Sequence, residues 1–290
     1  MKVDKNYKEV ILVYLALTSC MLFWGLSFIW TKIVLEAYKP VTIILLRLII
    51  SSVLLIGIGV VLGKLQPISR RELKNVVILA FFQPFLYFMF ENYGLKEVSS
   101  TVASVIISTI PLLSPVAAHF FLKEKATWMN ILEIVLSIIG VMMVILRDNF
   151  TLKVSTGGVL LLLGAVIAAI IYSVIISKDI YRGNIYSLIT YQNSIGILLF
   201  IPVFFLIDYQ DLSFSYPGNN VIAALLALSV LASTLAFIFV TYGIKKVGIT
   251  KSNAFTNIIP VFTAFFSWLL LDEKLSLINI MGILIVIAGL

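Results

Sequence analysis

The sequence is poor in the residues from which metal sites and disulfide frameworks are built. Its 290 residues include one cysteine, Cys20, and one histidine, His119. A single cysteine excludes an intrachain disulfide, and one cysteine with one histidine argues against a structural zinc site. No stretch matches the G-x-x-x-x-G-K-[ST] loop, so the sequence offers no direct use of ATP. We expect neither a cofactor nor a metal.

Charged residues are also scarce, and their scarcity identifies the solvent. They make up 12% of the chain, about half their usual share in a soluble domain, while 61% of the residues are hydrophobic. The mean hydropathy is +1.11. A water-soluble fold could not cover so much apolar surface. We therefore expect an integral membrane protein whose surroundings are a lipid bilayer.

Long apolar runs predict ten transmembrane helices. A helix needs about 20 apolar residues to cross a bilayer, and the candidate segments are 9–34, 41–63, 75–95, 98–121, 127–146, 156–177, 185–207, 218–243, 247–271 and 276–290. The alternating segments of a transmembrane β-barrel are missing. The predicted fold class is all-α integral membrane. The tenth span is short, so we expect the native chain to continue past Leu290.

The net charge of +7 does not indicate a nucleic-acid partner, because the basic residues are scattered at the ends of the apolar runs. In a membrane protein this distribution reports orientation, since cytoplasmic loops are enriched in lysine and arginine. Most of the basic residues share one side if the N-terminus lies in the cytoplasm. We expect a multi-pass protein of the bacterial inner membrane with both termini in the cytoplasm.

Motifs recur along the chain at an interval of 149 residues. The pairs that share this interval are Pro111 and Pro260, Glu124 and Glu273, Lys125 and Lys274, Asn130 and Asn279, and Gly140 and Gly289. Apolar composition cannot produce repeats at such positions, so we predict two homologous halves, residues 1–147 and 148–290. Each half holds five spans, and an odd number inverts the second half relative to the first. Inverted repeats are a common transporter architecture, with the substrate site near the midplane.

The repeated motifs also carry a family resemblance. They are Phe23-Trp24-Gly25, Tyr93-Gly94-Leu95-Lys96, Pro111 and Leu122-Lys123-Glu124-Lys125 in the first half, and Tyr242-Gly243, Pro260-Val261 and Leu271-Asp272-Glu273-Lys274 in the second. Over essentially the whole chain they resemble the drug/metabolite transporter superfamily, EamA type. The resemblance implies a ten-helix transporter of amino acids, related metabolites, nucleotide sugars, sugar phosphates or drugs, often an exporter. The motifs do not specify a substrate.

Two charged residues, Arg47 and Glu91, lie well inside predicted spans. Intramembrane charges are costly and mark functional sites by default. Both residues lie about 6 to 9 Å along their helices from the same membrane face, so they could form a charge pair with a gating role. Arg47 could instead extend to the interface or contact a charged or zwitterionic substrate. Glu91 could couple transport to protons.

Polar stripes on spans four and nine are candidates for the substrate site. Ser104 and Ser108 lie one turn apart on one helix face, and Asn253 and Asn257 occupy the repeat-equivalent positions. Each stripe leads into a proline, which frees a backbone carbonyl one turn earlier. These helix-break positions are Pro111 and Pro260. The stripes either line a cavity or hydrogen-bond to neighbouring helices.

Three aromatic residues near the middle of their spans, Trp24, Tyr87 and Tyr172, are candidates for the cavity wall. They would offer an amphiphilic substrate apolar contact and a polar group, whereas most other aromatics should face lipid or the interfaces. Gln83-Pro84 should bend the third span.

Together these features favour a secondary transporter over an enzyme, with a small organic metabolite such as an amino acid or a derivative as its substrate. Exchange of sugar phosphates or nucleotide sugars would call for several cations in the cavity, and the sequence offers Arg47 and Lys251. A flippase for a lipid-linked substrate stays open. A membrane enzyme would need an acid/base or metal cluster at one interface. Export follows from the resemblance alone, and the sequence specifies neither coupling ion nor oligomeric state.

Overall fold

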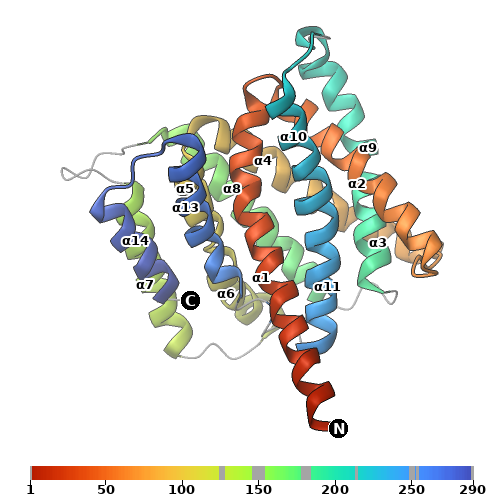
Figure 1. Ribbon diagram of the computed structural model, residues 1–290, viewed down its shortest axis with the longest axis horizontal. Coiled ribbons are helices and arrows are strands. Elements are labelled where there is room, and N and C mark those ends of the chain that lie inside the picture. The colour runs from red at the N-terminus through yellow and green to blue at the C-terminus, as the bar shows by residue number, and fades with distance from the viewer. Residues whose placement is uncertain are drawn as a thin grey trace.

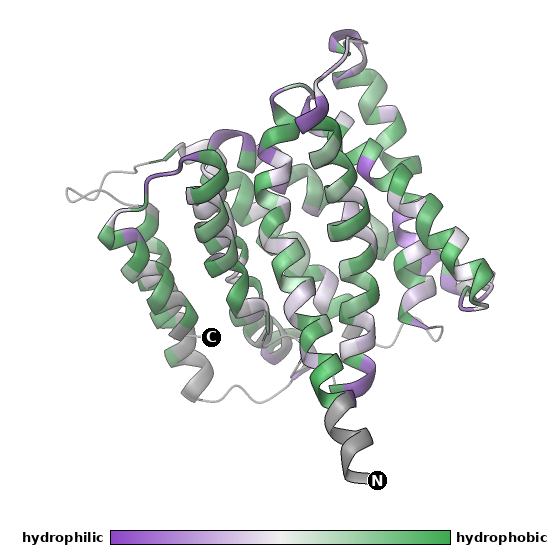
Figure 2. Cartoon of the chain, viewed as in Figure 1, coloured by the Kyte–Doolittle hydropathy of each residue, from purple (hydrophilic) through white to green (hydrophobic). Residues whose placement is uncertain are grey.

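The computed structural model describes residues 2–123, 128–145, 154–177, 184–212, 215–247, 252 and 255–288, and no strand occurs among them. Its long helices run side by side as a bundle, with the N-terminus at one end (Figure 1). We call the opposite end, where residues 36–39, 98–99 and 208–211 lie, the distal end. Hydrophobic residues cover most of the helix surfaces, and hydrophilic ones gather near helix ends and connections (Figure 2). The all-α membrane fold predicted from the composition is confirmed.

The first half of the chain forms the elements α1 (Lys2–Leu35), α2 (Pro40–Val61), α3 (Arg70–Ala80), η1 (Phe81–Leu86), α4 (Tyr87–Glu97), α5 (Ser100–Ile107), α6 (Ile110–Leu122) and α7 (Trp128–Ile145). The second half forms α8 (Thr156–Ser177), α9 (Ile185–Ile207), η2 (Tyr209–Asp211), α10 (Asn219–Ala227), η3 (Leu228–Leu235), α11 (Ala236–Val247), η4 (Phe255–Ile258), α13 (Ile259–Leu271) and α14 (Leu277–Ala288). The segments η1 and η3 are π-helical, and η2 and η4 are 3₁₀ turns.

Seven of the described helical segments are long and apolar enough to cross a membrane: Glu9–Leu35, Pro40–Val61, Glu72–Glu97, Ser100–Phe121, Thr156–Ile176, Ile185–Ile207 and Asn219–Val247. The helix α13 is apolar but shorter. Helices also form where the fifth and tenth spans are predicted, as α7 and α14. The count of ten spans stays a prediction for these shorter segments.

The two halves of the chain interlock in a reciprocal pattern. The helix α1 packs against α10, η3, α11 and α13 of the second half, and α8 packs against α4, η1, α5 and α6 of the first. The helices α2 and α9 lie side by side, and each also contacts the π-helical segment of the other half. The pair α7 and α14 packs together at one side of the bundle (Figure 1). Such an exchange of partners is what the predicted inverted repeats lead us to expect. Their predicted boundary at residue 147 lies outside the described residues.

A small residue allows α4 and α8 to pack at close range. A Cβ atom added at Gly94 would lie 2.8 Å from Leu162 Cγ and 3.1 Å from the carbonyl oxygen of Gly158. The crossing therefore depends on the missing side chain at Gly94, as small residues commonly allow in membrane helix pairs.

The repeated Glu-Lys motif of the second half has a defined structural role at the distal end. Glu273 accepts hydrogen bonds from the backbone N–H of Ser100 (2.8 Å) and from the Thr101 hydroxyl (2.8 Å). These residues begin α5, where N–H groups have no partner within the helix. A carboxylate is favoured there because it also complements the helix dipole. The second half thus caps a helix of the first, while the repeat partner Glu124 lies outside the described residues.

We predict that Gly94→Ala lowers the thermal unfolding midpoint of the purified protein, because the added methyl group overpacks the α4–α8 crossing at a cost of about 1–3 kcal/mol. Gly57→Ala is the matched control, since nothing lies within 4 Å of a Cβ at that position. Equal midpoints for the two variants would contradict the close packing of α4 on α8.

Candidate substrate site

The third and eighth spans both leave α-helical geometry at corresponding positions, in the π-helical segments η1 and η3, and we call these two segments the interruptions. The third span passes through η1, where Gln83 leaves the helical conformation (φ −146°, ψ 114°) immediately before Pro84. The eighth passes through η3, which contains Ala232. Gln83 and Ala232 are 149 positions apart, the interval of the sequence repeat. Discontinuous helices at equivalent places in two inverted repeats are a frequent basis for substrate sites in transporters.

Each interruption exposes backbone carbonyls, which need donors because lipid supplies none. The Gln83 carbonyl accepts from Gln192 Nε2 at 3.5 Å, and the Ala232 carbonyl accepts from Trp24 Nε1 at 3.2 Å. The next carbonyl, that of Ser233, accepts from Ser51 Oγ at 2.7 Å. All three donors come from the half of the chain opposite to the interruption that they serve.

Arg47 lies beside the interruption of the eighth span. Its side chain is 4% exposed, and its Nε donates to Ser233 Oγ. The guanidinium carbon lies 4.3 Å from the centroid of the Phe88 ring, a cation–π contact. Ser233 is its hydrogen-bond partner within the described part of the chain, although a guanidinium carries five N–H donors. Its other N–H groups have no hydrogen-bond partner among the described residues.

Ser51 bonds the backbone of Ser233, the residue that Arg47 contacts, and it also bonds further polar side chains. It receives hydrogen bonds from Asn193 Nδ2 (3.3 Å) and Thr234 Oγ1 (3.1 Å) while donating to the Ser233 carbonyl. All of these residues are buried. They join α2, α9 and η3, and we call them the central polar cluster: Arg47, Ser51, Asn193, Ser233 and Thr234.

The contact between Arg47 and Ser233 has a counterpart in the other half. Gly196 and Pro84 occupy the positions 149 residues away, and a Cβ at Gly196 would lie 2.6 Å from Pro84 Cγ. In one half a helix therefore approaches the interruption through a glycine, and in the other it places an arginine there. The two contacts are related by the repeat, but one of them carries a charged side chain, Arg47, and the other does not.

The predicted residues Arg47 and Glu91 lie close enough for their charges to interact, but they form no direct ion pair among the described contacts. Glu91 Oε1 instead accepts a hydrogen bond from Tyr87, one turn earlier on α4, at 2.8 Å. A carboxylate, a phenol and a guanidinium thus face the same region from α4 and α2.

Tyr172 lies beside the other interruption. Its hydroxyl donates to Gln192 Oε1 at 3.3 Å, and Gln192 bonds the Gln83 carbonyl. Gln192 precedes Asn193 of the central polar cluster, so one turn of α9 serves both interruptions.

The polar stripes are placed differently from the aromatic and charged candidates. Ser104 and Ser108 are buried, and their hydroxyls bond carbonyls of their own helix, at Thr101 (2.9 Å) and Val105 (2.7 Å). Asn253 lies outside the described residues, as does the side chain of Asn257. The helix breaks at Ser108 shortly before Pro111.

Pro260 is the second residue of α13 and follows the 3₁₀ turn η4. The structure therefore brings together five of the candidates around the paired interruptions: Trp24, Arg47, Tyr87, Glu91 and Tyr172. The stripe of α5 packs elsewhere, against α8 and α13.

Four of the five cluster residues, and Gln192, are additional to the candidates that the sequence suggested. Mapping Gln83-Pro84 onto the second half by the 149-residue interval leads to Ala232 and Ser233, and this signal was available in the sequence. Ser51 and Asn193 carry no such signal, because small polar residues are common in membrane helices.

We predict that Ser51→Ala lowers the free energy of unfolding by roughly 1–3 kcal/mol, because it removes a donor and an acceptor shared by three buried groups. Its neighbour Ser52 is the matched control, since the Ser52 hydroxyl is buried without a hydrogen-bond partner. Ser52→Ala should be neutral or slightly stabilising. Equal losses in chemical unfolding of the two variants would argue against a structured cluster.

Known proteins resemble this chain along nearly its whole length. The model of the EamA-like transporter family matches residues 11–146 and again 156–290. The chain is 28% identical over 279 residues to an uncharacterized transporter of Archaeoglobus fulgidus, covering 95% of each chain. It is 26% identical over 274 residues to the uncharacterized transporter YcxC of Bacillus subtilis, covering 91% of this chain and 87% of the relative.

One solved structure, described as a crystal structure of a protein, has a TM-score of 0.69 and 18% sequence identity, covering 96% of this chain and 94% of that one. This likeness supports the fold alone. The family match covers nearly the whole chain in two consecutive copies. The protein is therefore a membrane transporter, and the chain belongs to the EamA-like transporter family.

Proposed function

We propose that this protein is a secondary transporter that exports a small organic metabolite, such as an amino acid or a derivative, by alternating access between its inverted repeats. The observation that carries the proposal is the pair of interruptions at Gln83 and Ala232, which faces a buried cation with unused donors. The proposed direction rests on the family resemblance.

The chemistry around the interruptions supports a substrate with one carboxylate. Arg47 is the single cation of the central polar cluster, and the other members are neutral hydrogen-bonding groups. A guanidinium binds a carboxylate in bidentate fashion. Glu91 lies within electrostatic reach of Arg47 and would suit an ammonium group. A sugar phosphate would bring more negative charge than this region balances.

The interruptions also supply a means of movement. Helix segments on the two sides of a π-helical break can change their relative angle with little loss of backbone hydrogen bonds. The donors Gln192 and Trp24 belong to the opposite half in each case, so movement between the halves would change the contacts of the freed carbonyls. The repeats would then expose the central polar cluster to one face at a time.

The basic residues support an orientation with both termini in the cytoplasm of a bacterium and the distal end outside its inner membrane. Driving energy would come from the substrate gradient, from exchange or from an ion gradient, with protons acting at Glu91 as one candidate.

Counterflow in proteoliposomes tests the proposal, using amino acids, lipophilic amines and phosphate esters with and without an imposed pH gradient. We predict saturable exchange of a zwitterionic or neutral solute, reduced at least about tenfold by Arg47→Lys, because lysine keeps the charge but not the planar fork. Arg70→Lys is the matched control, since Arg70 is exposed at the start of α3.

Exchange of phosphate esters in place of amino acids would contradict the proposed substrate class. Equal rates for Arg47→Lys and wild type would remove Arg47 from the substrate site. Absence of exchange across the panel by folded protein, with scrambling of a labelled lipid in the same vesicles, would replace the proposal with a flippase.

A further inference from the structure

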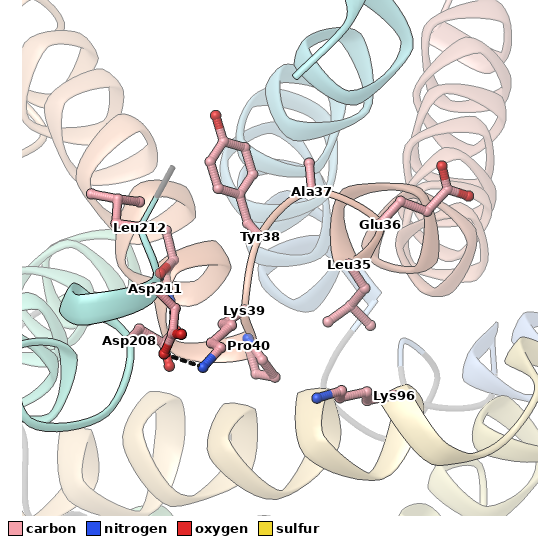
Figure 3. A pocket seen from close by; sticks show the side chains of 11 residues that line it. Leu35, Glu36, Ala37, Tyr38, Lys39, Pro40, Lys96, Asp208, Asp211 and Leu212 are labelled. Atoms are coloured by element: carbon pink, nitrogen blue, oxygen red, sulfur yellow. Dashed lines mark hydrogen bonds and ion pairs between the residues drawn. The ribbon is translucent and has the colours of Figure 1, made fainter. Parts of the chain in front are cut away.

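A polar pocket opens at the distal end, apart from the central polar cluster. Its volume is about 260 Å³, and it is formed where the connection between α1 and α2 meets the end of α9 and the end of α4. The charged residues that line it are Glu36, Lys39, Lys96, Asp208 and Asp211 (Figure 3).

Asp208 is the buried member of this set, with 1% of its surface exposed. Its Oδ2 accepts the backbone N–H (2.8 Å) and the hydroxyl (3.0 Å) of Thr42, near the start of α2. Its Oδ1 is buried and has no hydrogen-bond partner. Leaving a carboxylate oxygen unpaired inside the protein is costly, and Asp208 lines the pocket.

The position of Asp208 at the end of a helix also favours binding of a cation beside it. It follows the last residue of α9 as the C-cap, where the helix dipole disfavours negative charge. The neighbouring cation Lys39 is already paired with Asp211. Within the described residues no group of three or more His, Cys, Asp or Glu side chains could hold a metal ion, so an organic cation suits the site better.

Lys96 supplies the complementary charge. It is exposed at the end of α4, and the described contacts give it no ion-pair partner. Figure 3 shows the ammonium end of Lys96 directed from α4 toward Pro40 and the side of the pocket that holds Asp208 and Asp211. The residues that line the pocket therefore include a carboxylate with an unpaired oxygen, Asp208, and a lysine, Lys96, that has no ion-pair partner among the described contacts.

We propose that this pocket binds a small zwitterion, with the ligand's ammonium group on Asp208 and its carboxylate on Lys96. Its volume lies at the small end of ligand sites, which limits the ligand to a single small metabolite. The site is distinct from the central polar cluster and would hold a zwitterion at the mouth of the transporter.

Ligand-observed saturation-transfer NMR tests this site on the full chain in nanodiscs of zwitterionic lipid. The probes are glycine, methylammonium, which carries only the cationic end, and acetate, which carries only the anionic end. The protein carries Arg47→Lys, so that ligand at the central polar cluster contributes little. We expect saturable signals from glycine and methylammonium.

In this background Asp208→Asn should weaken the binding of both glycine and methylammonium at least about tenfold, since it removes a charged acceptor. Lys96→Gln should weaken the binding of glycine but not of methylammonium. Glu97→Gln is the control, because Glu97 is a neighbouring carboxylate that does not line the pocket. The same protein without Arg47→Lys should give the same methylammonium signal, so this proposal and the transport proposal fail separately.

Unchanged methylammonium binding in Asp208→Asn would overturn the proposal, as would binding of acetate alone. Displacement of methylammonium by Na⁺, relative to choline at equal ionic strength, would reassign the site to a metal cation. If Asp208→Asn does not elute as folded protein, Lys96→Gln tests the proposal in its place. Unchanged binding of glycine to Lys96→Gln would contradict a site that holds both ends of a zwitterion.

Discussion

The structure depends on the rule that a backbone carbonyl in lipid must find a donor inside the protein. Two membrane-spanning helices depart from α-helical geometry, at Gln83 and around Ala232, and both obey this rule because a side chain from the other half of the chain donates to the carbonyl there. The donors, Gln192 and Trp24, are fixed by the packing of α9 and α1. The interruptions therefore form hydrogen bonds across the interface between the halves, and these bonds contribute to holding the halves together.

The reciprocal packing of the two halves explains the location of the central polar cluster. A helix of each half packs on the interruption of the other, through Gly196 on Pro84 and through Arg47 on Ser233. The inverted repeat sets the same backbone geometry twice, and divergence between the copies then supplied one glycine and one arginine. A charged side chain therefore lies at one of these two related contacts and not at the other.

The sequence was sufficient for the features that follow from composition and repetition. Apolar runs predicted the helices, and the interval between Pro111 and Pro260 predicted two related halves. The hydrogen-bond partner of Arg47 could not be predicted, because Ser233 meets it only after α2 and η3, which are distant in the sequence, have packed with a particular rotation about their axes. The role of Glu273 could not be predicted either. Its motif recurs in the sequence, but its position as the cap of α5 depends on contact between the halves.

If the two interruptions form one site that opens to alternate faces, the accessibility of cysteines placed on either side of it should change with transport. Cys20→Ser removes the single native cysteine. Leu46→Cys then reports on the distal half of the bundle, and Ser173→Cys reports on the half toward the N-terminus. When a solute that supports counterflow is added, we predict that maleimide labelling rises at one of these two cysteines and falls at the other. Labelling that rises or falls together at both sites would contradict alternating access.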